Sequence, residues 1–263
     1  MIRLIATDLD GTLLTPDKRL PEGIFPLIEK FAQKGVLFAP ASGRQIANLK
    51  QLFAPVKDKV LFLAENGAIV SYRDEILFQD PVPKAEIPRA LAEIRSIPGL
   101  YPMLCTPDYA YIESMERPFS DYAFASYTHC RYVEKLETVM ELPVLKIAIY
   151  DAVGSAVNCM QKLPKRLPSL RTMISGADWC DVSKKDANKG KAISFLQRHF
   201  SIAKEDCVAF GDHMNDFEML KESGISFVPA NAYPAMLNAF PNHILSNGEN
   251  GVCRTLERLL EEL

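Results

Sequence analysis

Short apolar runs alternate with stretches of helical periodicity along the first 80 residues. Apolar runs at 2–7, 36–42 and 60–67 have the length expected of buried strands. Between the first two, apolar residues recur at helical spacing from 24 to 31, and Gly35 follows as a stop signal. Strands separated by helices in this way predict a parallel sheet with helices on both faces.

The same alternation returns near the end of the chain. Helices are predicted at 189–200, 216–224 and 251–263, and strands at 207–212 and 225–229. The two ends of the chain are therefore predicted to form one Rossmann-like α/β core.

The alternation of predicted strands and helices changes in the middle of the chain. Pro81, Pro83 and Pro88 lie close together in a polar setting, as in a linker. Beyond them, strands are predicted in pairs, with helical stretches between. The paired strands are 100–106 with 110–114 and 144–152 with 170–176, and the helical stretches lie around 86–97 and 154–163. We expect an inserted α+β domain at 84–186, with an antiparallel sheet and helices on one side, inside a core formed by 1–83 and 187–263.

Composition narrows the function classes. The 263 residues are 48% hydrophobic and carry a net charge of −3, without the basic balance typical of nucleic-acid binders. The six cysteines form no C-x-x-C pair and the four histidines are dispersed, so a zinc site is not indicated and reduced thiols are expected. No apolar run approaches the roughly 20 residues of a membrane span, and no leader segment is recognisable. We expect a soluble cytoplasmic protein, monomeric or weakly homo-oligomeric, without membrane partners.

Polar residues gather where the predicted core strands end and where one helix begins. Ligands of open parallel sheets bind outside the carboxyl ends of the strands. Several carboxylates brought together there would repel each other, unless a divalent cation such as Mg²⁺ lies among them. The neighbouring hydroxyl, amide and ammonium groups suit a phosphate. The residues are Asp8, Asp10, Ser42, Gly43, Lys189, Asp212, Asn215 and Asp216.

Each feature also has a plain structural interpretation. Asp8 and Asp10 could serve an Asx turn or a helix cap, and Ser42 could be an ordinary N-cap. Lys189 could belong to a solvated lysine-rich face, and the loop from 211 to 216 could be merely polar. Their joint occurrence at strand ends and a helix start favours a functional site.

Four sequence motifs resemble those of the haloacid dehalogenase superfamily of aspartyl-nucleophile phosphohydrolases. They are "DLDGTLL", "ASGR", "NKGKAI" and "GDHMNDFEML", in that order, and "ENGA" and "ENGV" are typical of the Cof-type subfamily. The resemblance runs from the first strand to the last helix. It implies an α/β cap domain between the second and third motifs, where the insertion is predicted.

The resemblance also implies residue roles. Asp8 is the expected nucleophile, which forms an aspartyl-phosphate, and Asp10 is the expected general acid and base. Asp8, the backbone carbonyl of Asp10, and Asp212 are expected to hold Mg²⁺. Asp216 is expected to act indirectly, by orienting metal-bound water or Lys189. The expected phosphate-binding groups are the Leu9 amide, Ser42, the Gly43 amide, Lys189 and Asn215.

Three departures from the subfamily pattern concern the site. The stretch "DVSKKDANKGKA" replaces the usual Asp-Val-Thr-Pro-Lys-Gly, so Lys189 is the expected catalytic lysine and Lys185 the alternative. His213 is bulkier than the usual residue, and we interpret it as a surface-loop side chain. "VPANA" retains Asn231 but stiffens a turn where glycine is usual.

The expected activity is a Mg²⁺-dependent phosphomonoesterase acting on a small phosphorylated metabolite, such as a sugar phosphate or a pyridoxal-phosphate-like compound. The expected cap would cover the site and select the substrate. Two alternatives stay open. A phosphotransferase or mutase would use the same residues, and a non-catalytic protein would bind phosphate or Mg²⁺ without turnover. A dinucleotide-binding function is not indicated, because no G-x-G-x-x-G follows the first strand.

Overall fold

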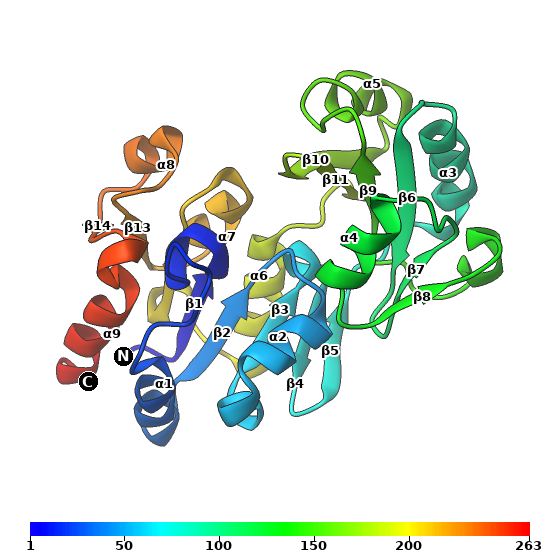
Figure 1. Cartoon of the computed structure of the whole chain (residues 1–263). Helices are drawn as coiled ribbons and strands as arrows, with labels where there is room; N and C mark the ends of the chain where they lie inside the picture. The colour runs from blue at the N-terminus through cyan, green and yellow to red at the C-terminus, as the bar shows by residue number, and fades with distance from the viewer. The chain divides into compact units, whose positions relative to one another are not determined.

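The chain folds into two compact units, each with its own sheet (Figure 1). The computed structural model describes residues 1–263. The first unit comprises Met1–Arg44, Leu49–Phe78 and Asn188–Leu263, and the second comprises Gln45–Asn48 and Gln79–Ala187. The second unit thus begins at Gln79, rather than at the predicted residue 84, and takes in four residues near 46.

The first unit is built on an eight-stranded sheet. Its order is β14-β13-β12-β1-β2-β3-β4-β5, parallel from β14 to β3, with β4 antiparallel to β3. The strands are β1 Leu4–Asp8, β2 Leu37–Ala41, β3 Leu61–Ala64, β4 Ile69–Tyr72, β5 Glu75–Gln79, β12 Cys207–Phe210, β13 Ile225–Pro229 and β14 His243–Ile244. This sheet, with helices on both faces, confirms the predicted α/β class.

Alternate residues of these strands face two helical layers. Leu4 and Ala6 of β1 face a core formed with three helices, α6 Lys189–Phe200, α7 Phe217–Lys221 and α8 Pro234–Ala239. The remaining helices of this unit are α1 Ile24–Gln33, α2 Ile46–Leu52, whose first three residues are grouped with the second unit, and α9 Gly251–Glu261. Helix α1 packs against α9 (Figure 1). No helix of the structure is both long and apolar enough to cross a bilayer.

The second unit has a six-stranded sheet of order β10-β11-β9-β6-β7-β8. Its strands are β6 Leu100–Cys105, β7 Ala110–Ile112, β8 Cys130–Tyr132, β9 Lys146–Asp151, β10 Leu170–Gly176 and β11 Trp179–Lys184. Neighbours are antiparallel, except that β7 and β8 are parallel. The prediction that 144–152 pairs with 170–176 is wrong, because β11 lies between β9 and β10.

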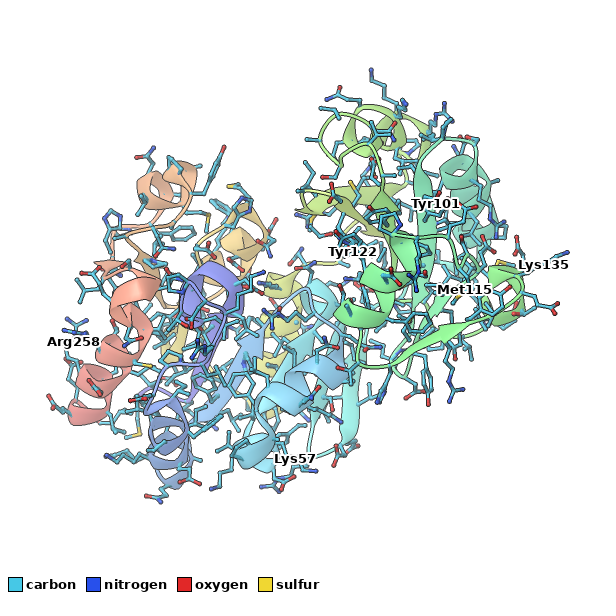
Figure 2. The ribbon with its side chains drawn as sticks, viewed as in Figure 1. Lys57, Tyr101, Met115, Tyr122, Lys135 and Arg258 are labelled. Carbon is cyan, nitrogen blue, oxygen red and sulfur yellow. The ribbon has the colours of Figure 1, made fainter.

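Helices cover both faces of this second sheet, which corrects the prediction that they lie on one side. One face packs on α3 Ile87–Arg95 and α5 Cys159–Arg166. The other packs on α4 Phe119–Ser126, which the sequence did not predict. On that face the ring of Tyr150 lies 5.5–6.2 Å from four other aromatic rings, and two of these are labelled in Figure 2. The four are Tyr101, Phe119, Tyr122 and Trp179.

The amphipathic helix α9 makes the packing of the first unit testable. Leu256 is fully buried, whereas Leu245 of the same unit is 44% exposed. Leu256→Ala should lower the free energy of unfolding by about 2–5 kcal/mol, through lost burial and the cavity left behind. Leu245→Ala should change it by less than about 1 kcal/mol. Urea unfolding followed by circular dichroism measures both, and equal effects would contradict the burial described here.

Candidate active site

The predicted site residues lie at adjacent strand ends of the first unit. Strand β1 lies between β2 and β12 and is parallel to both, so the carboxyl ends of all three meet at one edge. Asp8 closes β1, Ser42 follows β2, and Asp212 follows β12 after one glycine. The edge of the sheet therefore brings together residues that are far apart in the sequence.

Lys189 connects two of these carboxylates. Its ammonium Nζ donates to Asp8 Oδ1 at 2.5 Å and to Asp216 Oδ1 at 2.6 Å, and its side chain is fully buried. Asn188 fixes the start of α6, because its side chain accepts a hydrogen bond from the Lys191 amide. The helix start thus delivers one cation into a group of carboxylates.

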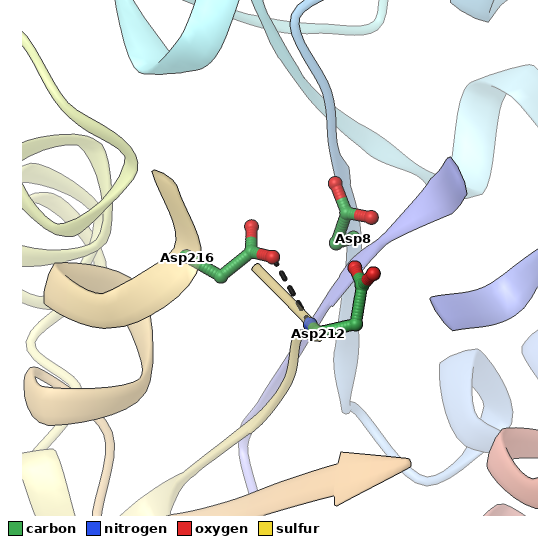
Figure 3. Close-up of side chains that lie close together, drawn as sticks. All are labelled: Asp8, Asp212 and Asp216. Atoms are coloured by element: carbon green, nitrogen blue, oxygen red, sulfur yellow. Dashed lines mark hydrogen bonds between the residues drawn. The ribbon is translucent and has the colours of Figure 1, made fainter. Parts of the chain in front are cut away.

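Asp8, Asp212 and Asp216 form that group (Figure 3). One oxygen from each lies within 4.8 Å of the others. Asp216 Oδ2 accepts hydrogen bonds from the backbone amides of Asp212 and His213, at 3.1 Å each. Thr12 Oγ1 donates to Asp212 Oδ1 at 2.9 Å. Each carboxylate is therefore held in a defined orientation.

Burial and mutual repulsion shift the protonation of this group. Burial raises the pKa of Asp8 well above its usual range, and the charges of Asp216 and Asp212 raise it further, against the lowering effect of Lys189. Burial and Asp216 also raise the pKa of Asp212. Burial opposes the charge of Lys189, but Asp216 and Asp8 outweigh it and raise its pKa, so the ammonium stays charged.

This donor set fits a hard divalent cation. The group offers carboxylate oxygens and contains no nitrogen or sulfur ligand. Lys189 is one cation against three carboxylates, so negative charge remains, and this charge adds to burial in raising the pKa values of Asp8 and Asp212. A cation here would stabilise the ionised form of both groups.

The second strand end carries hydroxyl and amide groups. Ser42 is buried, and its hydroxyl accepts from the Arg44 amide at 3.2 Å. Asn215 Nδ2 donates to Asn66 Oδ1 at 3.3 Å, and the Asn66 side chain lies so close to Gly43 that a Cβ there would be 3.0 Å from Asn66 Nδ2. Predicted residues from two motifs therefore meet through Asn66, which lies in the "ENGA" stretch but was assigned no role from the sequence.

The turn that contains Asn66 has an unusual backbone. Glu65, Asn66 and Gly67 all have positive φ, at 50°, 55° and 88°. A Cβ on Gly67 would lie 2.6 Å from the carbonyl oxygen of Asn188, immediately before Lys189. Non-glycine residues in this conformation are uncommon and cluster at functional sites. The "ENGA" motif was the sequence signal for this turn.

Asp10 lies apart from the buried carboxylates. Its side chain is 46% exposed and forms a two-bond pair with the Arg44 guanidinium, with Nε to Oδ2 at 3.0 Å and Nη2 to Oδ1 at 2.7 Å. Such fork-to-carboxylate pairs fix geometry as well as charge. The only sequence signal for this pair was the place of Arg44 at the end of the second motif.

The remaining predicted residues are placed as follows. Leu9 is fully buried in the turn after β1. His213 is exposed, accepts from the Asp216 amide, and has its ring 5.3 Å from that of Tyr233. Lys185, the alternative catalytic lysine, is exposed in the second unit and donates to the Pro168 carbonyl. Of the two lysines, Lys189 is the one that contacts Asp8.

The sequence matches a model of the haloacid dehalogenase-like hydrolase family over residues 5–256. The chain belongs to this family. The HMP-PP phosphatase of Cronobacter sakazakii is 30% identical to this hydrolase, over 92% of this chain and 89% of that protein. The 5-amino-6-(5-phospho-D-ribitylamino)uracil phosphatase YbjI of Escherichia coli is 25% identical, over 99% and 97%. The crystal structure of TM0651 from Thermotoga maritima has a TM-score of 0.87 and 26% identity, over 98% and 97%.

The buried Lys189 should contribute strongly to the stability of the metal-free protein. Lys189→Ala leaves Asp8 and Asp216 buried without their cation, and we expect a loss of about 3–5 kcal/mol in unfolding free energy. Lys185→Ala, at an exposed position, should change it by less than about 0.5 kcal/mol. Urea unfolding in EDTA measures both, and a stable Lys189→Ala protein would contradict the arrangement.

Metal binding should strengthen as the pH rises. Asp8 and Asp212 bind protons more tightly in the folded state, because their folded pKa values lie above the unfolded value of about 4. The metal-free protein therefore loses stability as the pH rises from about 4 through the folded pKa values. A Mg²⁺ ion held by these carboxylates would bind their ionised form, so we expect a Mg²⁺-induced rise in Tm that is larger at pH 8 than at pH 5.

Thermal unfolding with and without Mg²⁺ at both pH values tests this dependence. Asp212→Asn should abolish most of the Mg²⁺-induced rise at pH 8. An equal rise at the two pH values would show that protons and Mg²⁺ do not compete for these carboxylates.

Proposed function

We propose that this hydrolase is a Mg²⁺-dependent phosphomonoesterase that cleaves a small phosphorylated metabolite through an aspartyl-phosphate on Asp8. The observation that carries the proposal is the contact of Lys189 with Asp8, buried at the carboxyl edge of the sheet beside Asp212. A charged lysine beside a carboxylate keeps that carboxylate available as a nucleophile and neutralises an incoming phosphate. The phosphatase names of the relatives support the same reaction class.

Substrate binding is assigned to the groups around Ser42. The Ser42 hydroxyl, the Gly43 and Leu9 amides, the Lys189 ammonium and the Asn215 side-chain amide would hold the phosphate oxygens. All are hydrogen-bond donors, as the charge on a transferring phosphoryl group requires. Asp216 acts through Lys189, which it contacts at 2.6 Å.

The reaction then has two steps. In the first, an Asp8 carboxylate oxygen attacks phosphorus, the bond from phosphorus to the leaving oxygen breaks, and Asp10 protonates that oxygen. In the second, Asp10 removes a proton from water, which attacks the aspartyl-phosphate and releases inorganic phosphate and Asp8. When bound to Asp8, the Asp10 carbonyl and Asp212, Mg²⁺ would offset the repulsion between the carboxylate and the phosphate dianion.

The pair between Asp10 and Arg44 has a consequence for this scheme. Both oxygens of Asp10 accept hydrogen bonds from the guanidinium. Each carboxylate oxygen has a second lone pair, which stays available for the proton that passes to the leaving oxygen. Arg44 therefore fixes the orientation of Asp10, and the segment after β2 contributes both to phosphate binding and to the placement of the acid–base residue.

We propose that the second unit is the cap domain and that it selects the substrate from small phosphomonoesters, such as sugar phosphates and pyridoxal-phosphate-like compounds. Its sheet carries the aromatic group around Tyr150 on the face that α4 covers, where Tyr150 and Phe119 are buried and Tyr122 is 49% exposed. An exposed aromatic ring such as that of Tyr122 offers apolar area to a flat or partly apolar leaving group.

Phosphate release from 4-nitrophenyl phosphate tests the proposed reaction. The wild-type protein should release phosphate with Mg²⁺ and not in EDTA. Asp8→Asn keeps the shape of the side chain and removes the nucleophilic charge, so we expect the rate to fall at least about a thousandfold. Asp58→Asn, at an exposed aspartate of the same unit, should retain the wild-type rate.

Three other results would contradict the proposal. Equal release by the wild type and Asp8→Asn would reject Asp8 as the nucleophile. Transfer of the phosphoryl group to an added sugar, in place of release, would indicate a phosphotransferase or mutase. Mg²⁺ and phosphate binding with no turnover of any phosphomonoester in a broad panel would indicate a non-catalytic binding protein.

A further inference from the structure

The turn that carries Asp10 is not a regular helix. It spans Leu9–Leu13, and inside it Asp10 and Gly11 have non-helical backbone angles, with Gly11 at φ 88°. One backbone bond closes the turn, from the Leu14 amide to the Leu9 carbonyl at 2.8 Å. Regular helical hydrogen bonding therefore does not by itself determine where the turn lies.

Two asparagines from distant parts of the chain bind carbonyl groups of this turn and its end. Asn231 Nδ2 donates to the Gly11 carbonyl at 2.8 Å, and Asn247 Nδ2 donates to the Leu14 carbonyl at 2.8 Å. The two are joined, because the Asn247 amide donates to Asn231 Oδ1 at 2.9 Å. We call Asn231 and Asn247, with these three bonds, the asparagine brace.

The brace is itself anchored. Asn231 lies just after β13, and Asn247 begins the short helical turn Asn247–Glu249. The side chains of Ser246 and Glu249 cap that turn reciprocally. The brace therefore links the turn after β1 to the end of β13 and to the segment before α9.

The turn also contacts Asp212. A Cβ on Gly11 would collide with the Asp212 carboxylate, and Thr12 donates to that same carboxylate. The turn is thus held by Asp212 as well as by the brace. Loss of the brace removes the bonds to the carbonyls of Gly11 and Leu14 and leaves the contacts with Asp212.

From this geometry we infer that Asn231, supported by Asn247, is a positioning residue that sets the place of Asp10 relative to the leaving-group oxygen. Asn231 contacts neither the buried carboxylates nor Lys189 by any bond described here, and it acts through the carbonyl of the residue that follows Asp10. The inference rests on the proposed function, because it concerns the acid–base role of Asp10.

Two substrates that differ in their leaving group distinguish a displaced general acid from an overall loss of activity. Phenyl phosphate and 4-nitrophenyl phosphate have similar shapes, but phenolate is much the stronger base and depends more on protonation as it leaves. A displaced general acid should therefore slow the first more than the second. General acid catalysis is worth about 10²–10⁴-fold, and small displacements lose a large share of it.

The experiment compares kcat and KM of the wild type, Asn231→Ala and Asn247→Ala on both compounds with Mg²⁺. For Asn231→Ala we expect kcat/KM on phenyl phosphate to fall about tenfold and kcat/KM on 4-nitrophenyl phosphate to fall less than about threefold, because kcat/KM reports the first step, before the aspartyl-phosphate that both compounds share. Asn247→Ala should show the same selectivity to a smaller degree. Asn242→Ala is the matched control, since Asn242 is an exposed asparagine of the same unit whose side chain also donates to a backbone carbonyl, that of Ser226.

The outcomes distinguish this inference from the proposed function. Equal losses of kcat/KM on both compounds, or no loss, in a protein whose wild type depends on Asp8 would overturn the brace and leave the proposed function standing. A wild type whose release does not depend on Asp8 would overturn both. If Asn231→Ala does not fold, Asn247→Ala decides, because it removes one brace bond and leaves the Asn231 side chain in place.

Discussion

Repulsion between buried carboxylates is the constraint on which this site depends. Asp8, Asp212 and Asp216 lie at one edge of the sheet, and parallel strand order brings them there. Isolated charges are expensive to bury, and like charges close together raise that cost. Lys189 reduces it from inside the group, and its place at the first residue of α6 makes the packing of that helix a requirement of the site. The packing of α6 and the charge balance of the site therefore both depend on the Lys189 ammonium group.

Glycine residues let the backbone pack directly against the charged residues of the site. Gly11, Gly67 and Gly211 have no room for a Cβ, because each would meet a neighbouring site element. At Gly211 the obstacle is the Asp216 side chain, and at Gly67 it is the backbone that leads into Lys189. Close approach of this kind fixes the carboxylates more firmly than flexible side-chain contacts would, and a preorganised site needs such rigidity.

The core could be predicted well from the sequence, and the second unit less well, for a physical reason. Core strands such as Leu61–Ala64 are buried on both faces and read as continuous apolar runs. Strand β11 was missed because Asp181 interrupts its apolar pattern. That aspartate is buried against Lys146 of β9 at 3.1 Å, a partner 35 residues away that the local pattern does not reveal.

Helix α4 was missed because Tyr122 and Phe124 are exposed on it, so its apolar residues mark no single buried face. The same limit applies at the site, where the strand-end motifs were readable but the bonds from Arg44, Asn66 and Asn231 to distant residues were not.

The two aspartates of the first motif are separated by only one residue, yet the chain gives them opposite environments. Asp8 ends β1 and points to the buried Lys189, whereas Asp10 lies beyond the strand, is half exposed, and is held by Arg44. The separation follows from the backbone, because the chain leaves the strand at Asp8 and turns at Gly11. Each carboxylate thereby gains its own cation, and their mutual repulsion is reduced without a ligand. Two carboxylates with such distinct surroundings suit the distinct roles proposed for them, one fixed in the interior for attack on phosphorus and one at the surface for exchange of protons with the leaving group and water.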